Sequence, residues 1–209
     1  MIKFRSTIVA AFLLFTVSSF AQKDTTAGQF SLGMRSTISS FTDAQSVGFG
    51  AGGQFRIRFS KHMNTDWYSD YITTNIQNLG YRRDAHIGWS VVFYLDQNPI
   101  VKGQVTPYIV AGQCFDYTNV YSDYSNSSME RWSAAAAQGG FGMTYNFTKY
   151  FDFSAVAQYM LHIGTNVVTQ VETDEKTNQQ YLSITNPGGA SLNGHLLITF
   201  SVNYMLGRL

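Results

Sequence analysis

The sequence predicts an all-β protein, an antiparallel up-and-down transmembrane β-barrel of eight strands. The last predicted strand, His195–Leu206, alternates large apolar side chains with a more polar set. Successive side chains of a strand point to opposite faces, so one face of this strand is apolar and the other mostly polar. Several earlier segments repeat the pattern behind an export signal, and short and long connections alternate between them. This combination is typical of a barrel that crosses an outer membrane.

The start of the chain has the features of a cleaved export signal. Lys3 and Arg5 form a positive region, residues 8–17 are apolar apart from one Thr, and the sequence up to Ala21 has the small-x-small form that a signal peptidase cuts. The apolar run is shorter than the about 20 residues of a transmembrane helix. Strands closed into a barrel are therefore the expected membrane-spanning structure. The predicted domains are a signal peptide, residues 1–21, and an outer-membrane β-barrel domain, residues 22–209.

Composition excludes some classes of function. The 14 Lys and Arg residues nearly balance the 13 Asp and Glu residues, and no basic patch is present, so we expect no nucleic-acid partner. Cys114 is the single cysteine, which excludes an intramolecular disulfide. Nothing in the composition points to a cofactor.

Gly, Asn, Ser and charged clusters divide the chain into eight alternating segments. The facing of the fifth segment stays open, because it contains a proline. Glycines on the polar faces of the second and sixth segments suit a crowded barrel interior. The predicted strands are Gln29–Ile38, Val47–Ser60, Asp66–Ile76, His86–Tyr94, Thr106–Tyr117, Ala137–Asn146, Phe151–Ile163 and His195–Leu206.

The connections predict which ends of the strands face the periplasm. Residues 61–65 and 148–149 are short enough for periplasmic turns, whereas residues 118–133 and 164–193 suit the outer side. The connection 97–105 is long for its predicted periplasmic place. Within the outer connection, Val167–Val171 and Tyr181–Ile184 predict a tall hairpin above the membrane. The alternative is an additional strand pair, making ten, but each arm is shorter than the ~9 to 11 residues of a spanning strand.

A soluble barrel or sandwich with the apolar face inward is the main competing fold, because alternation alone does not exclude it. Two observations favour the membrane. The large apolar side chains of eight strands would overfill the narrow interior of an eight-stranded barrel. Aromatic residues also gather at the predicted periplasmic ends of the strands, as in an interfacial girdle.

Two segments resemble a known group of proteins. Thr106-Pro-Tyr-Ile-Val-Ala-Gly112 is similar to a Pro-Tyr-x-x-x-Gly strand, and Gly194–Tyr204 is similar to the C-terminal assembly signal, of the small eight-stranded outer-membrane barrels typified by the OmpA membrane domain, OmpX and OmpW. The resemblance implies the outer membrane of a diderm bacterium, surrounding outer-membrane lipid and insertion by the barrel-assembly machinery. Members act as structural anchors, adhesins, small-solute conduits, lipid-modifying enzymes or secretion-machine subunits, so the resemblance does not choose an activity.

Four charged residues are predicted to form ion pairs in the lumen. A five-residue turn would place Arg56 opposite Asp70, and Arg58 one step from both Asp66 and Asp70. Charges in a narrow lumen are costly unless they are paired. The cluster is either a plug that sets the register of the strands or a selectivity constriction for ions. The narrow interior favours the plug.

A second polar cluster is predicted at the outer mouth. His162 and His195 lie on adjoining strands, and His86 lies next to Asp116 if the fifth strand faces inward there. Histidines can bind a metal or act as a base. The two pairs are expected about two strand spacings apart, ~10 Å, whereas zinc needs every nitrogen within about 2.1 Å. The sequence therefore predicts no shared metal site.

One motif raises an enzymatic alternative. His162-Ile-Gly-Thr-Asn166 resembles the His-x-Ser-Asn motif of lipid A deacylases, but it has one extra residue and Thr165 in place of Ser. Those enzymes carry the motif on the lipid-facing surface, whereas His162 is predicted to face inward, so no catalytic residues are assigned. We expect a non-enzymatic outer-membrane barrel with a filled polar lumen, acting through extracellular loops or partner proteins. The alternatives are a subunit of an outer-membrane secretion or assembly complex, a small-solute conduit and a lipid A-modifying enzyme.

Overall fold

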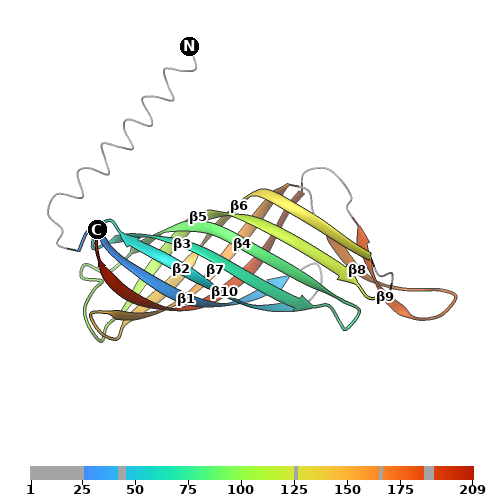
Figure 1. The fold of residues 1–209 in the computed structure, drawn as a ribbon, viewed down its shortest axis with the longest axis horizontal. Helices are drawn as coiled ribbons and strands as arrows, with labels where there is room; N and C mark the ends of the chain where they lie inside the picture. Colours follow the sequence, from blue (N-terminus) through green and yellow to red (C-terminus); the bar gives the residue numbers. More distant parts are fainter. Residues whose placement is uncertain (1–25, 42–45, 125–126, 165–166, 186–190) are drawn as a thin grey trace, which may run out of the picture.

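The computed structural model describes residues 26–41, 46–124, 127–164, 167–185 and 191–209 as a closed barrel with a separate hairpin (Figure 1). The predicted signal peptide lies outside these residues. None of the described residues belongs to a helix that could span a membrane. The strands are β1 (Gln29–Phe41), β2 (Ser46–Arg58), β3 (Met63–Asn75), β4 (Gly80–Tyr94), β5 (Val105–Ser122), β6 (Ser127–Asn146), β7 (Phe151–Gly164), β8 (Val168–Thr173), β9 (Gln180–Thr185) and β10 (Ser191–Arg208).

Eight of these strands form the barrel, each antiparallel to its neighbours, in the order β1-β10-β7-β6-β5-β4-β3-β2. The predicted all-β barrel of eight strands is confirmed. The ten-strand alternative is wrong, because β8 and β9 have six residues each and pair only with one another. We call the end of the barrel near β8 and β9 the hairpin end. The opposite end, with the connections 59–62, 95–104 and 147–150, is the turn end.

Several strands are longer than predicted, most of all at the hairpin end. β4 begins at Gly80 rather than His86, and β5 and β6 leave only residues 123–126 between them. The predicted loop 118–133 is therefore mostly strand. Its Tyr, Ser and Asn residues lack the apolar alternation, yet the backbone pairing continues from Asp116↔Ser133 to Ser122↔Ser127. Where a strand is no longer apolar on one face, the hydrophobic pattern ends before the hydrogen-bonded ladder does.

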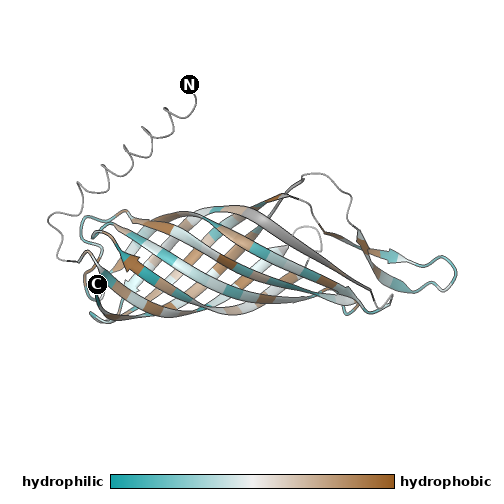
Figure 2. Cartoon of the chain, turned by 45° about the horizontal axis from the view of Figure 1, so that its top comes forward, coloured by the Kyte–Doolittle hydropathy of each residue, from teal (hydrophilic) through white to brown (hydrophobic). Residues whose placement is uncertain are grey.

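The two faces of the barrel wall differ in polarity, and hydropathy alternates along the strands (Figure 2). Large apolar side chains cover the outside; Met34 is 78% exposed and Phe141 is 73% exposed. Most polar side chains of the wall face the inside. The sequence left open which face of β5 points inward, and the structure shows that Thr106, Cys114 and Asp116 do, because they are buried.

Small residues on the inner face make room for their neighbours. A Cβ on Gly88 would lie 2.5 Å from the Cβ of Cys114, and one on Gly142 would overlap the ring of Tyr108. Both positions are far inside van der Waals contact. The glycines that the sequence places on the polar faces therefore serve close packing inside the barrel.

The long connection 95–104 packs against inward-facing side chains at the turn end of the barrel. The carbonyl of Pro99 accepts hydrogen bonds from Thr106 Oγ1 at 3.1 Å and from Asn146 Nδ2 at 2.9 Å. Both donors are inward-facing side chains of the barrel wall. The unusual length of this connection is thus explained by its packing against the lumen.

Candidate functional site in the barrel lumen

Arg56 of β2 is the centre of an ion-pair network near the turn end. Its guanidinium binds Asp66 of β3 through two bonds, Nε to Oδ1 at 2.7 Å and Nη2 to Oδ2 at 3.0 Å. Its Nη1 also donates to Asp152 of β7, 3.2 Å from Oδ1. A bidentate pair with a second carboxylate is a strong arrangement for a buried cation. The network spans the lumen, because β2 and β7 are not neighbours in the sheet.

The predicted pairing of Arg56 with Asp70 is wrong. The ladder places Arg56 opposite Asp66, and Gly52 opposite Asp70. The cause is a tight turn, in which Ser60 and Met63 exchange backbone hydrogen bonds of 3.1 and 3.3 Å. This turn is shorter than the five residues expected and slides β3 along β2.

Arg58 was predicted beside Asp66 and Asp70, but it contacts amide oxygens instead. It donates to Asn64 Oδ1 at 3.2 Å and to Gln29 Oε1 at 2.9 Å. Asp70 contacts Arg35 of β1, which sequence reasoning missed, with Nε and Oδ1 3.0 Å apart. The guanidinium of Arg35 also lies 4.1 Å from the centre of the Tyr68 ring. Arg35 shares the polar face of its strand with Ser31 and Thr37, which is the signal that could have revealed it.

Hydrogen bonds between neutral side chains cross the middle of the lumen. Tyr68 donates to Gln138 Oε1 at 2.8 Å, and Gln138 Nε2 donates to Ser90 Oγ at 2.6 Å. Gln158 Nε2 donates to the same Gln138 oxygen at 3.3 Å. The cavity around this layer, between Arg35, Arg56 and Gln158, measures about 20 Å³. That volume holds roughly one water molecule.

An apolar layer follows toward the hairpin end, whereas the sequence analysis predicted a filled polar lumen. Its members come from β3, β5, β6, β7 and β10, and the Sγ of Cys114 lies 3.5 Å from the Sδ of Met160. Apart from the Tyr68 hydroxyl, which donates to Gln138, and the Cys114 thiol, its side chains offer no hydrogen bonds to an ion or to water. The buried side chains are Tyr68, Ile72, Cys114, Ala136, Met160 and Leu197.

The predicted mouth residues His86, Asp116, His162 and His195 form one cluster above this layer. The ring centres lie 4.9 Å apart for His162 and His195, 5.8 Å for His86 and His195, and 6.4 Å for His86 and His162. His162 Nε2 lies 3.2 Å from His195 Nδ1, and its Nδ1 lies 3.0 Å from Asp116 Oδ2. The predicted separation of two pairs is wrong, because rings from opposite walls meet across so narrow a lumen. Still, no three potential ligands among the described residues are arranged to hold a metal ion.

Charged and apolar side chains complete the hairpin end. Arg82 Nε lies 3.0 Å from both carboxylate oxygens of Asp84, and Thr118 donates to Asp84 Oδ1 at 2.7 Å. Above them, Ser122 Oγ donates to the carbonyl of Leu182 on β9 at 2.9 Å. This hydrogen bond connects β9 of the hairpin to β5 of the barrel wall. An apolar cluster, which we call the cap, packs the hairpin against β5 and the β3–β4 connection. It consists of Ile76, Val120, Val167 and Leu182.

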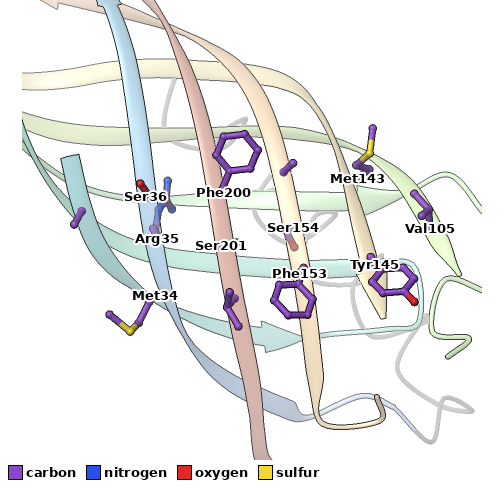
Figure 3. Close-up of a pocket in the computed structure, with 13 residues that line it drawn as sticks. Met34, Arg35, Ser36, Val105, Met143, Tyr145, Phe153, Ser154, Phe200 and Ser201 are labelled. Carbon is purple, nitrogen blue, oxygen red and sulfur yellow. The ribbon is translucent and has the colours of Figure 1, made fainter. Parts of the chain in front are cut away.

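The outside of the barrel carries an open apolar hollow of about 600 Å³ (Figure 3). Phe153 of β7 and Phe200 of β10 stand at its centre, with Met143 and Tyr145 of β6 at one side. At the turn end, the rings of Phe151 and Tyr204 lie 4.8 Å apart. An apolar band with aromatic residues near one end is the surface expected of a barrel in a lipid bilayer.

The lipid A deacylase motif lies partly outside the described residues, which do not include Thr165 and Asn166. His162 faces the lumen and is buried among Asp116 and His195. An inward-facing His162 is on the wrong side of the wall for chemistry at the lipid-facing surface.

The chain has the fold of the small eight-stranded outer-membrane barrels. It is similar to the crystal structure of Neisserial surface protein A, with a TM-score of 0.50 and 16% identity over 84% of this chain and 95% of that one. It is also similar to a major outer membrane protein from Thermus thermophilus, with a TM-score of 0.55 and 11% identity over 85% of this chain and 98% of that one. No protein-family model matches the chain, and no curated protein matches its sequence.

Proposed function

We propose that the protein is a non-enzymatic outer-membrane barrel with a filled lumen, which acts through its hairpin end on partners outside the cell. The observation that carries this proposal is the succession of side-chain layers along the lumen. The Arg56 network, the Gln138 layer, the apolar layer, the histidine cluster and the Leu182 cap follow one another. Ion conduction would need all of them to separate.

The hairpin supports a role in surface recognition. β8 and β9 extend beyond the barrel at the hairpin end, opposite the end where β1 begins and β10 ends (Figure 1). Tyr124 and Tyr181 stack with their ring centres 5.1 Å apart. Their hydroxyls donate to Asp174 and Glu172, at 2.9 and 2.7 Å. Tyr124 is exposed and Tyr181 is half-buried. Tyrosines held in place by carboxylates are suited to contacts with a partner, because they bury large area at low entropic cost.

The apolar outer face supports a location in the outer membrane, with the wall surrounded by lipid and the hairpin end outside the cell. The predicted signal peptide and insertion by the barrel-assembly machinery belong to the same proposal. A fixed partner in the membrane would make the protein a subunit of a larger complex.

Surface labelling tests this orientation. In a Cys114→Ser background, a cysteine at Asp174 should react with an impermeant maleimide on intact cells, and a cysteine at Lys149 should react only after the outer membrane is permeabilised. Asp174 and Lys149 both lie in connections between strands, at opposite ends of the barrel. They therefore form a matched pair. Labelling of Lys149→Cys on intact cells would overturn the proposed orientation.

Crosslinking tests the role of the hairpin. A photo-crosslinking residue at Tyr181 should form a defined product in native membranes, and the same residue at Lys149 should not. A stoichiometric product at a lipid-facing position such as Phe141 instead would favour a membrane complex over recognition by the hairpin.

A further inference from the structure

The histidine cluster lies between the apolar layer below it and the Arg82–Asp84 pair with Thr118 above it, and the apolar cap lies beyond that pair. Along β5, Cys114 belongs to the apolar layer below, Asp116 to the cluster, and Val120 to the cap above. β7 and β10 repeat this order with Met160 below His162 and Leu197 below His195. Three of the four histidines of the chain therefore meet at one level of the lumen.

The cluster has the means to balance one positive charge but not three. Asp116 faces His162 at 3.0 Å, so it can compensate one protonated ring. The carboxylate of Asp84 is occupied by Arg82 and Thr118. Neither ring nitrogen of the fully buried His86 has a hydrogen-bond partner within the described part of the chain. A second charged ring would thus be buried without compensation.

Repulsion between charged rings is strong at these distances. The rings lie 4.9 to 6.4 Å apart, and the interaction of two charges increases as the local dielectric constant falls. The other titratable groups that face the cluster are Arg82 and Asp84 from β4, Cys114 from β5 and Asp70 from β3, which lies opposite His86 in the ladder and binds Arg35. None of them supplies a further free negative charge at neutral pH.

We propose that the histidine cluster holds the hairpin-end half of the lumen closed at neutral pH and opens it on binding protons. At neutral pH the rings stay together and join β4, β7 and β10 across the interior. Histidine titrates near pH ~6.5, and below that range a second proton drives the rings apart and opens this half of the lumen to water. The proposal goes beyond surface recognition, since it holds whatever partner the hairpin binds.

Linkage gives the sign of the effect. The open state binds more protons than the closed state, so acidification favours the open state. For each additional proton bound, the ratio of open to closed molecules rises about tenfold per pH unit.

Cys114 is a native probe of this opening, because it is buried directly below the cluster. The folded protein in detergent micelles is treated with a dithiodipyridine, which reacts with thiols at acidic as well as neutral pH. The rate is divided by that of the unfolded protein at the same pH. This ratio should rise by at least about tenfold between about pH 7.5 and about pH 5.5.

Three variants distinguish opening caused by the histidine cluster from general effects of acid on the protein. His86→Phe keeps a ring in place but removes one site of protonation, so its reactivity ratio should rise less with acidification than that of wild type. His62→Asn alters the histidine outside the cluster and should behave as wild type. Asp116→Asn removes the compensating charge and should shift opening to higher pH.

The ring resonances of the wild-type histidines, followed by NMR, supply a measurement that needs no variant. The three cluster rings should titrate together with the rise in Cys114 reactivity. Equal pH dependence in His86→Phe and wild type would overturn the proposal. So would cluster rings that become fully protonated while Cys114 stays unreactive.

Discussion

The two halves of the lumen are occupied in different ways. At the turn end and in the middle of the barrel, Arg56 and Arg35 have permanent charge and each binds a carboxylate directly. At the hairpin end, histidines lie between an apolar layer and the Arg82–Asp84 pair, and the hairpin packs over them. A buried pair of opposite charges has little reason to change around neutral pH, whereas imidazole is the side chain whose unperturbed titration lies nearest to that range. The comparison teaches that one narrow barrel can combine a pH-independent closure with a pH-sensitive one.

The largest effect is expected for Asp70→Ala, because it leaves Arg35 buried beside Tyr68 without its carboxylate. Removing one partner of a buried pair costs about 3 to 5 kcal/mol. Urea unfolding in micelles, followed by gel mobility, measures the free energy of unfolding. The double variant Arg35→Met with Asp70→Ala should recover much of this loss, since no unpaired charge remains. An effect near zero for Asp70→Ala would remove the ion pair from the explanation of how the turn-end half is held.

A smaller and more local effect is expected for Leu182→Ala at the hairpin end. Truncating a buried leucine costs about 2 to 4 kcal/mol, and here the loss falls on the docking of β9 against Ile76 and Val120. Limited proteolysis within residues 174–179 should become faster while the barrel resists. The matched control is Val171→Ala, an exposed position on the same hairpin. Equal proteolysis of the two variants would show that the cap does not hold the hairpin.

Asp66→Asn should cost less than Asp70→Ala, because Arg56 retains Asp152. The lost charge-assisted bonds correspond to about 1.5 to 3 kcal/mol. Combining it with Asp152→Asn should cost more than the sum of the single changes, since Arg56 then has no carboxylate. Strict additivity, measured by the same urea unfolding, would contradict a shared network.

The smallest effect concerns the exposed hairpin and has no expected influence on barrel stability. Donation from the Tyr124 hydroxyl to Asp174 raises the pKa of Tyr124. The backbone N–H of Lys176, with further donors, lowers the pKa of Asp174, so its contribution is present above the usual Asp range and lost as the pH falls through the lowered value. NMR titration of ring-labelled tyrosine, assigned with Tyr124→Phe, measures the first shift. In Asp174→Asn the pKa of Tyr124 should return toward that of free tyrosine.

Alternation along the strands was enough to predict the barrel, its strand number and the separate hairpin, because burial on one face imposes a period of two. It could not predict the register between β2 and β3, which depends on the turn at Ser60. That register decides whether Arg56 meets Asp66 or Asp70. Strand ends at the hairpin end were also missed, since β4 and β5 continue through polar sequence where the period disappears.

Contacts across the lumen were the least predictable part. His86 and His195 lie on strands that are not neighbours in the sheet, so counting strand spacings along the wall overestimates their distance. The pairing of Arg35 with Asp70 is of the same kind, because β1 and β3 flank β2. Alternation indicates which residues face inward, but packing inside the barrel determines which of them touch.

Conductance through planar lipid bilayers tests the filled lumen most directly. The purified protein at neutral pH should produce no steady current, because the Arg56 network, the apolar layer and the cap lie in series. A known porin, inserted under the same conditions, serves as the positive control for insertion and conduction. Stable, ion-selective channels at neutral pH would contradict the proposal and identify the protein as a small-solute conduit.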